Sequence, residues 1–214
     1  MGINPINYTV RQAKRIVAIA ENVVEEADPK KIALQVLAPE TITVAKDYLG
    51  AQQRVVEIES LHEKEKGESV SALEQCRAMY DEIAPIIGSK LMITLPASST
   101  YATRDNYFSA AETMEGLLIA NNDKEWAQKL LERFSGLLNN AAKEYSESVL
   151  ANRSLQKAQK RRNEMGEEFR DVLVPFRQVV RATYGSESNE YRSLVDKRYR
   201  STDDGETPEP PQPA

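Results

Sequence analysis

One apolar repeat constrains the fold of this chain more than any other feature. From Trp126 to Val179, inward positions recur three or four residues apart in nearly one phase, and only the interval between Ala141 and Ser148 skips a position. This period is that of an amphipathic α-helix with one buried face. The repeat comprises Leu130, Phe134, Leu137, Ala141, Ser148, Ala151, Leu155, Ala158, Arg162, Met165, Phe169, Val172, Phe176 and Val179. It fits either one helix of about 60 residues, roughly 90 Å long at 1.5 Å per residue, or two helices that break near residues 163–166.

The N-terminal third predicts further helices. Residues 8–27 show the same spacing, and Asp28 before Pro29 is typical of a helix N-cap followed by proline. We expect a short helix over residues 29–38 and a long one over 39–66, since the residue before proline avoids the α conformation. A single helix kinked at Pro39 is the alternative.

A turn is expected at Gly67, because glycine commonly follows the last residue of a helix. The next helix would be an antiparallel neighbour of the 39–66 helix. Its apolar stripe comprises Val70, Leu73, Arg77, Tyr80, Ala84, Ile87 and Leu91. Pro85 would kink this helix, because proline removes a backbone donor and crowds the preceding turn. Residues 91–95 are the only candidate for a strand.

The remaining helices follow from similar signals. A loop is expected at residues 95–100, then a helix whose buried face holds Tyr107, Ala111, Met114 and Leu118. Residues 121–123, Asn-Asn-Asp, indicate a turn and a cap.

Pro175 is expected to kink the long C-terminal repeat near its end. Gly185 should end that repeat, and Ser188 should cap a last short helix that reaches about residue 198.

Composition supports an all-α fold. The chain has 9 glycines and only 7% aromatic residues, and such low contents are typical of helices. The fractions of charged residues, 29%, and hydrophobic residues, 41%, are ordinary for a soluble protein. We predict an elongated up-and-down helical bundle of about five to seven helices, some kinked at prolines. Residues 1–200 would form a single domain, and the acidic, proline-rich residues 201–214 a disordered tail.

The chain is expected to act in the cytoplasm. Its single cysteine, Cys76, excludes an internal disulfide, so nothing requires an oxidising compartment. No run of about 18 apolar residues predicts a membrane span, and the first residues lack the basic and apolar regions of a signal peptide.

Enzymatic chemistry finds little support in the residues. Glu59 and His62 form a Glu-x-x-His pair, but a di-iron bundle uses two such pairs and this chain has 1 histidine. Cys76 and His62 would lie on facing segments of the predicted hairpin, with no third group to orient them. We therefore expect no catalytic residue, no cofactor, no metal and no enzyme activity.

A basic cluster is the most suggestive candidate for binding. Its residues are Arg153, Lys157, Lys160, Arg161 and Arg162. Lys157, Lys160 and Arg161 share one helix face, so they could contact the phosphates of a nucleic acid or an anionic lipid surface. The simpler interpretation is that the cluster is solvated or pairs with acidic residues 57–68 of a neighbouring helix. The overall net charge of −5 favours the second interpretation.

The segment RATYGSESNEY at residues 181–191 resembles the C-terminal segment of a loose group of uncharacterised bacterial all-helical proteins. The resemblance covers an aromatic-glycine turn followed by Ser-x-Glu-Tyr, and it implies no activity. From the residues alone, the segment is a glycine C-cap followed by a serine N-cap.

The function predicted from the sequence is that of a non-enzymatic structural or partner-binding helical bundle. A protein partner or self-association is expected. The alternative is binding of nucleic acid or an anionic surface through residues 153–162.

Overall fold

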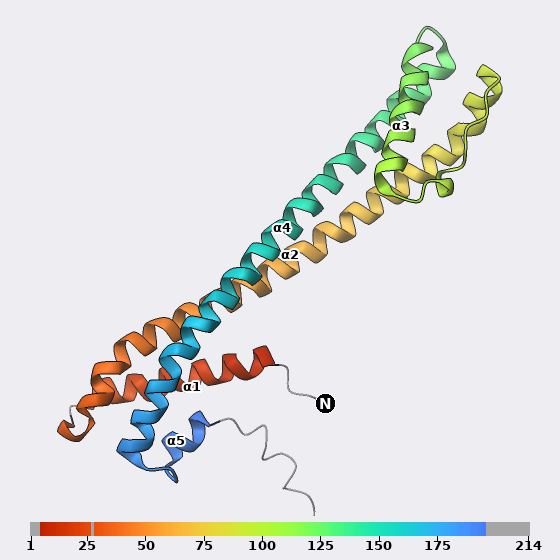
Figure 1. The fold of residues 1–214 in the computed structure, drawn as a ribbon. Coiled ribbons are helices and arrows are strands. Elements are labelled where there is room, and N and C mark those ends of the chain that lie inside the picture. The colour runs from red at the N-terminus through yellow and green to blue at the C-terminus, as the bar shows by residue number, and fades with distance from the viewer. Residues whose placement is uncertain (1–4, 27, 196–214) are drawn as a thin grey trace, which may run out of the picture. The chain divides into compact units, whose positions relative to one another are not determined.

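The structure is a computed structural model that describes residues 5–26 and 28–195, with side chains described from Val10 onward (Figure 1). The described chain is helical, and no β-strand occurs in it, so the predicted all-α class is confirmed. The predicted tail at residues 201–214 lies outside the described residues. In chain order the elements are α1 (Pro5–Glu25), the 3-10 turn η1 (Pro29–Lys31), α2 (Ile32–Leu91), the 3-10 turn η2 (Ser98–Thr100), α3 (Arg104–Ala120), α4 (Glu125–Tyr184) and α5 (Asn189–Leu194).

The chain divides into two compact units, and α2 and α4 each contribute to both. Unit 1 comprises residues 1–55 and 158–214, and unit 2 comprises residues 56–157. Each unit has a hydrophobic core of its own. That residues 1–200 form a single domain stays a prediction.

α2 is one helix of 60 residues that passes through Pro39, Gly67 and Pro85. The predicted helix end at Gly67 and the antiparallel hairpin after it are therefore wrong. The separate helices over residues 29–38 and 39–66 are wrong too, because one helix continues through Pro39. Buried or partly buried side chains repeat every seven residues across Gly67: Val55, His62, Ser69, Cys76 and Ile83. A glycine inside a helix costs about 1 kcal/mol, which burial of this continuous stripe outweighs.

α4 is also one helix of 60 residues, with Pro175 inside it. It does not break at residues 163–166. Gly166 there is buried against α2: a Cβ atom on Gly166 would lie 3.3 Å from Cε2 of Tyr48. Tyr48 stacks on Phe169 with ring centroids 5.5 Å apart. The segment where a break was considered thus contains a close contact between α2 and α4 within unit 1.

α5 closes unit 1 beside α1. The Nη1 atom of Arg15 on α1 donates to the carbonyl of Ser193 at 3.1 Å. Ser188 caps α5 as predicted, since its hydroxyl accepts from the amide of Tyr191 at 3.1 Å. α5 ends at Leu194, earlier than predicted, because Val195 is extended.

α3 packs on one side of the α2–α4 pair in unit 2. The four residues predicted for its inner face are all fully buried: Tyr107, Ala111, Met114 and Leu118. Tyr80 of α2 is the centre of this core, with ring centroids 5.8 Å from Tyr107 and 6.5 Å from Phe134 of α4. Three helices therefore share one aromatic cluster.

The end of α2 is a tight reversal, and residues 91–95, the only candidate for a strand, form none. The amide of Ile93 donates to the carbonyl of Gly88 at 3.0 Å, the bond of a Schellman motif. A Cβ atom on Gly88 would lie 2.8 Å from the Ile93 carbonyl oxygen, so glycine is required there. Met92 takes the left-handed position, with φ of 54° and a side chain that is 95% exposed.

Replacing Met92 by glycine is expected to raise the free energy of unfolding by about 1 kcal/mol, because a left-handed conformation costs an L-residue about that much. Urea unfolding followed by circular dichroism measures the change. Ser89→Gly, in the helical part of the same turn, is the matched control and should lower stability by a similar amount. A loss of stability in Met92→Gly would contradict the assigned turn.

Candidate functional site

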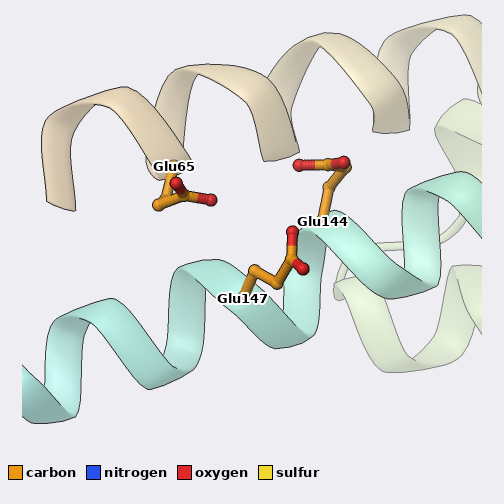
Figure 2. A group of neighbouring side chains, drawn as sticks. All are labelled: Glu65, Glu144 and Glu147. Atoms are coloured by element: carbon orange, nitrogen blue, oxygen red, sulfur yellow. The ribbon is translucent and has the colours of Figure 1, made fainter. Parts of the chain in front are cut away.

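Three glutamates from two helices come together in unit 2. Glu65 lies on α2, and Glu144 and Glu147 lie on α4; their carboxylate oxygens fall within 4.8 Å of one another. Figure 2 shows the three side chains converging between the two helices. The side chains of Glu65 and Glu144 are only 16% and 15% exposed. Sequence reasoning missed this group because the register of α2 against α4 is needed to find it.

Lysines on the same helices offset part of this charge. Lys143 lies 3.6 Å from Glu144 and 3.7 Å from Glu147, and Lys64 lies 3.7 Å from Glu65. Glu68 beside Lys64 raises the pKa of its ammonium group, and Glu65 and Glu144 add to this effect. Carboxylate oxygens are the ligands that hard divalent cations prefer, but this group already has cationic partners within the protein.

A buried serine continues the group along α2. Ser69 lies one helical turn after Glu65 and is 1% exposed, and its hydroxyl has no hydrogen-bond partner in the described part of the chain. We call Glu65, Ser69, Glu144 and Glu147 the polar layer. The hydrophobic core of unit 2 begins beyond it, at Ala72 on α2 and Ala141 on α4.

The histidine and the cysteine are not brought together. His62 and Cys76 lie on the same helix, 14 residues apart, or about 21 Å along its axis. They do not face each other across a hairpin as the sequence suggested. His62 lies 3.6 Å from Glu63, and neither His62 nor Glu59 belongs to the glutamate group.

The ionisable groups in the core of unit 2 are Cys76, Tyr80 and Tyr107, all nearly inaccessible. Burial raises the pKa of each. The guanidinium carbon of Arg77 lies 5.0 Å from the centre of the Tyr107 ring, a cation–π contact. The Tyr107 hydroxyl interacts with the Cys76 thiol but has no hydrogen-bond partner of normal geometry in the described chain. These groups favour their neutral forms, so they suit a core better than a nucleophilic site.

Tyr107→Phe is expected to flatten the loss of stability at alkaline pH. The folded-state pKa values of Cys76, Tyr80 and Tyr107 are raised above the ordinary 9.0 of a thiol and 10.0 of a phenol. Their stabilising contribution is complete below those ordinary values and is lost as the pH rises through the folded-state values. Urea unfolding at several pH values should show a shallower decline for the variant.

At neutral pH the same variant should be as stable as the parent or up to about 1 kcal/mol more stable, since the buried hydroxyl that it removes has no hydrogen-bond partner of normal geometry. Tyr145→Phe on α4, against which Arg104 packs, is the matched control. An alkaline decline as steep as that of the parent would contradict the assignment to Tyr107.

The five residues of the basic cluster all lie on α4. Lys160 and Arg161 share Glu164, at 4.0 and 3.7 Å. Arg162 donates to the side-chain oxygen of Asn163 through Nε at 3.1 Å and Nη2 at 2.7 Å. Arg153 and Lys157 make no ion pair within the described residues. Binding through this cluster stays a prediction.

Among the acidic residues 57–68 of α2, Glu63, Glu65 and Glu68 form ion pairs with lysines of their own helix. Lys64 pairs with Glu65 and Glu68, and Lys66 pairs with Glu63, all on α2 itself. The pairs at spacings of three and four residues are typical of exposed helix surfaces.

A groove lies between α2 and α4 in unit 2. Its volume is about 520 Å³, and it is lined by Gln75, Ala78, Met79, Glu82, Arg133, Gly136 and Leu137. The groove is open to solvent, and its lining combines the small residues Ala78 and Gly136 with the nearly buried Met79 and the partly buried Leu137. No sequence prediction pointed to it.

Comparisons with protein-family models, with curated proteins and with solved structures find no match to this chain. None of the described helices combines the length and the apolarity that crossing a bilayer requires.

Proposed function

We propose that this chain is a non-enzymatic helical scaffold that acts by binding a protein partner, a second copy of itself included. The observation that carries the proposal is the groove on unit 2, a hollow open to solvent between two long helices whose lining includes the apolar residues Ala78, Met79 and Leu137. Apolar grooves of this kind receive a helix in many protein complexes.

The interactions of the charged side chains support the same proposal. Outside the groove, many of them form ion pairs with residues three or four positions away, such as Lys129 with Glu125 at 2.7 Å. The buried ionisable groups of unit 2 favour their neutral forms. The proposal includes a cytoplasmic setting, which the single cysteine supports because it requires no oxidising compartment.

Cross-linking tests the proposal. The full chain, treated with a lysine-reactive cross-linker in extracts of its source cells, should give cross-links to a protein from lysines of unit 2 such as Lys129. A concentration series by size exclusion with light scattering identifies self-association in the same preparation. A monomer at every concentration that cross-links to no protein would overturn the proposal.

Binding of nucleic acid or an anionic surface is the second candidate function. It is favoured by Arg153 and Lys157, which lack an ion pair within the described residues, and by Lys160, whose side chain is 81% exposed. Binding to a labelled DNA duplex, an RNA hairpin or anionic vesicles should weaken steeply with salt and be lost in Lys157→Glu/Lys160→Glu/Arg161→Glu. The absence of binding at low salt would remove this candidate.

A further inference from the structure

The groove in unit 2 lies on the side of the α2–α4 pair away from α3. α3 contacts Arg77 and Tyr80 of α2 through Tyr107. The groove residues Gln75, Met79 and Glu82 belong to another face of α2, since successive helical residues are turned by about 100°. Among the described residues of unit 2, α2 and α4 are therefore covered by a third helix on one side only, whereas a four-helix bundle adds a helix on the other side as well.

One exposed and one partly buried apolar side chain extend this face beyond the groove. Ile86 lies seven residues after Met79 on the same face of α2 and is 40% exposed. Leu130 lies seven residues before Leu137 on α4 and is partly buried. At Gly136 no atom lies within 4 Å of the position that a Cβ would take, so an incoming helix meets little obstruction there.

Two opposite charges face the groove without partners. Glu82 lines it from α2 and Arg133 from α4, and both residues are exposed. Neither forms an ion pair or hydrogen bond within the described part of the chain. An occupant that matches this face must therefore offer a positive charge opposite Glu82 and a negative charge opposite Arg133.

A second copy of the same groove offers these two charges at the right places for one of two orientations of a two-fold axis. A two-fold axis parallel to the helices places α2 of one copy over α4 of the other at the same height. Glu82 then faces the partner's Arg133, and Arg133 faces the partner's Glu82. An axis perpendicular to the helices would instead bring Glu82 against the partner's Glu82. The charge pattern therefore selects the first arrangement, a closed dimer in which every residue contact occurs twice.

We propose that two copies of this chain associate through the groove of unit 2. The α2 and α4 segments of both copies would form a four-helix bundle, in which Glu82 of each copy pairs with the partner's Arg133 and fixes the register. This inference rests on the proposed function, since it names the partner and the surface of that binding.

Charge reversal tests the inference on the full chain. Analytical ultracentrifugation over a concentration series should show a monomer–dimer equilibrium. Glu82→Arg and Arg133→Glu should each weaken it by about tenfold or more, because each places like charges at both symmetric contacts. The double variant Glu82→Arg/Arg133→Glu should recover the parental Kd within about threefold. A mixture of the two single variants should form a heterodimer, since both of its contacts then join opposite charges.

Glu74→Arg, an exposed acid on α2 outside the groove lining, is the matched control, and circular dichroism checks that each variant folds. A parent chain that stays monomeric, or a dimer that both single reversals leave unchanged, overturns the inference. Single reversals that neither the double variant nor the mixture restores overturn the pairing of Glu82 with the partner's Arg133, and with it the proposed dimer. The proposed function fails separately, only if the cross-linking experiment also finds no protein partner.

Discussion

Replacing Phe134 by alanine is expected to lower the free energy of unfolding by about 3–5 kcal/mol. Phe134 is fully buried on α4 and packs against Tyr80 of α2 in the core that α3 completes. Removing the ring therefore leaves a cavity that three helices border, and helices cannot close it without moving their whole packed faces. Urea unfolding measured by circular dichroism gives the size of the loss.

Hydrogen exchange should place the loss of Phe134→Ala within unit 2, with faster exchange in α3, because unit 1 has a core of its own. Leu150→Ala is the matched control on α4, since Leu150 is 55% exposed, and should change stability by less than about 0.5 kcal/mol. A loss below about 1 kcal/mol for Phe134→Ala would contradict its place in the core.

Replacing Asp81 by alanine is expected to cost about 2 kcal/mol. The carboxylate of Asp81 on α2 accepts from the backbone amide of Ser98 at 2.7 Å and from its hydroxyl at 2.6 Å. Ser98 is 4% exposed and begins the turn η2, so both of its donors would lose a partner away from water. Asp81 is itself exposed, which limits the size of the effect.

Hydrogen exchange should again locate the change. In Asp81→Ala the amides of residues 98–104 should exchange faster than in the parent, and exchange elsewhere should change less. Asp81→Asn keeps one acceptor oxygen and should lose about half as much stability. Asp123→Ala, in the turn before α4, is the control for removing an exposed acid. Equal stability of Asp81→Ala and the parent would show that the Asp81–Ser98 bonds do not hold this connection.

The sequence predicted the helical class and much of the local burial because the apolar period is a property of each helix alone. The inner face of α3 was predicted residue by residue, as was the cap at Ser188. In α2 the predicted stripe includes Val70, which is 38% exposed, and omits Cys76 and Ile83, which are fully buried. That error follows from the turn expected at Gly67, which restarted the phase of the stripe.

Features that depend on two helices at once could not be predicted in this way. The glutamates of the polar layer are 79 residues apart in sequence between Glu65 and Glu144, and no local pattern joins them. The groove has the same origin, because Met79 and Leu137 meet only once the register of α2 and α4 is set. The basic cluster on α4 was visible in the sequence because all five of its residues lie on one helix.

The polar layer has a consequence for how the length of this protein can vary. Buried positions of unit 2 repeat every seven residues on both helices, at Ser69, Cys76 and Ile83 on α2 and at Ala127, Phe134 and Ala141 on α4. A shift of one helix past the other by seven residues would keep the apolar faces together. In one direction, however, it would place Glu144 against a core residue such as Cys76. Charged groups buried without partners are costly. Insertions and deletions that fold are therefore expected to come in matched pairs, seven residues in α2 accompanied by seven in α4.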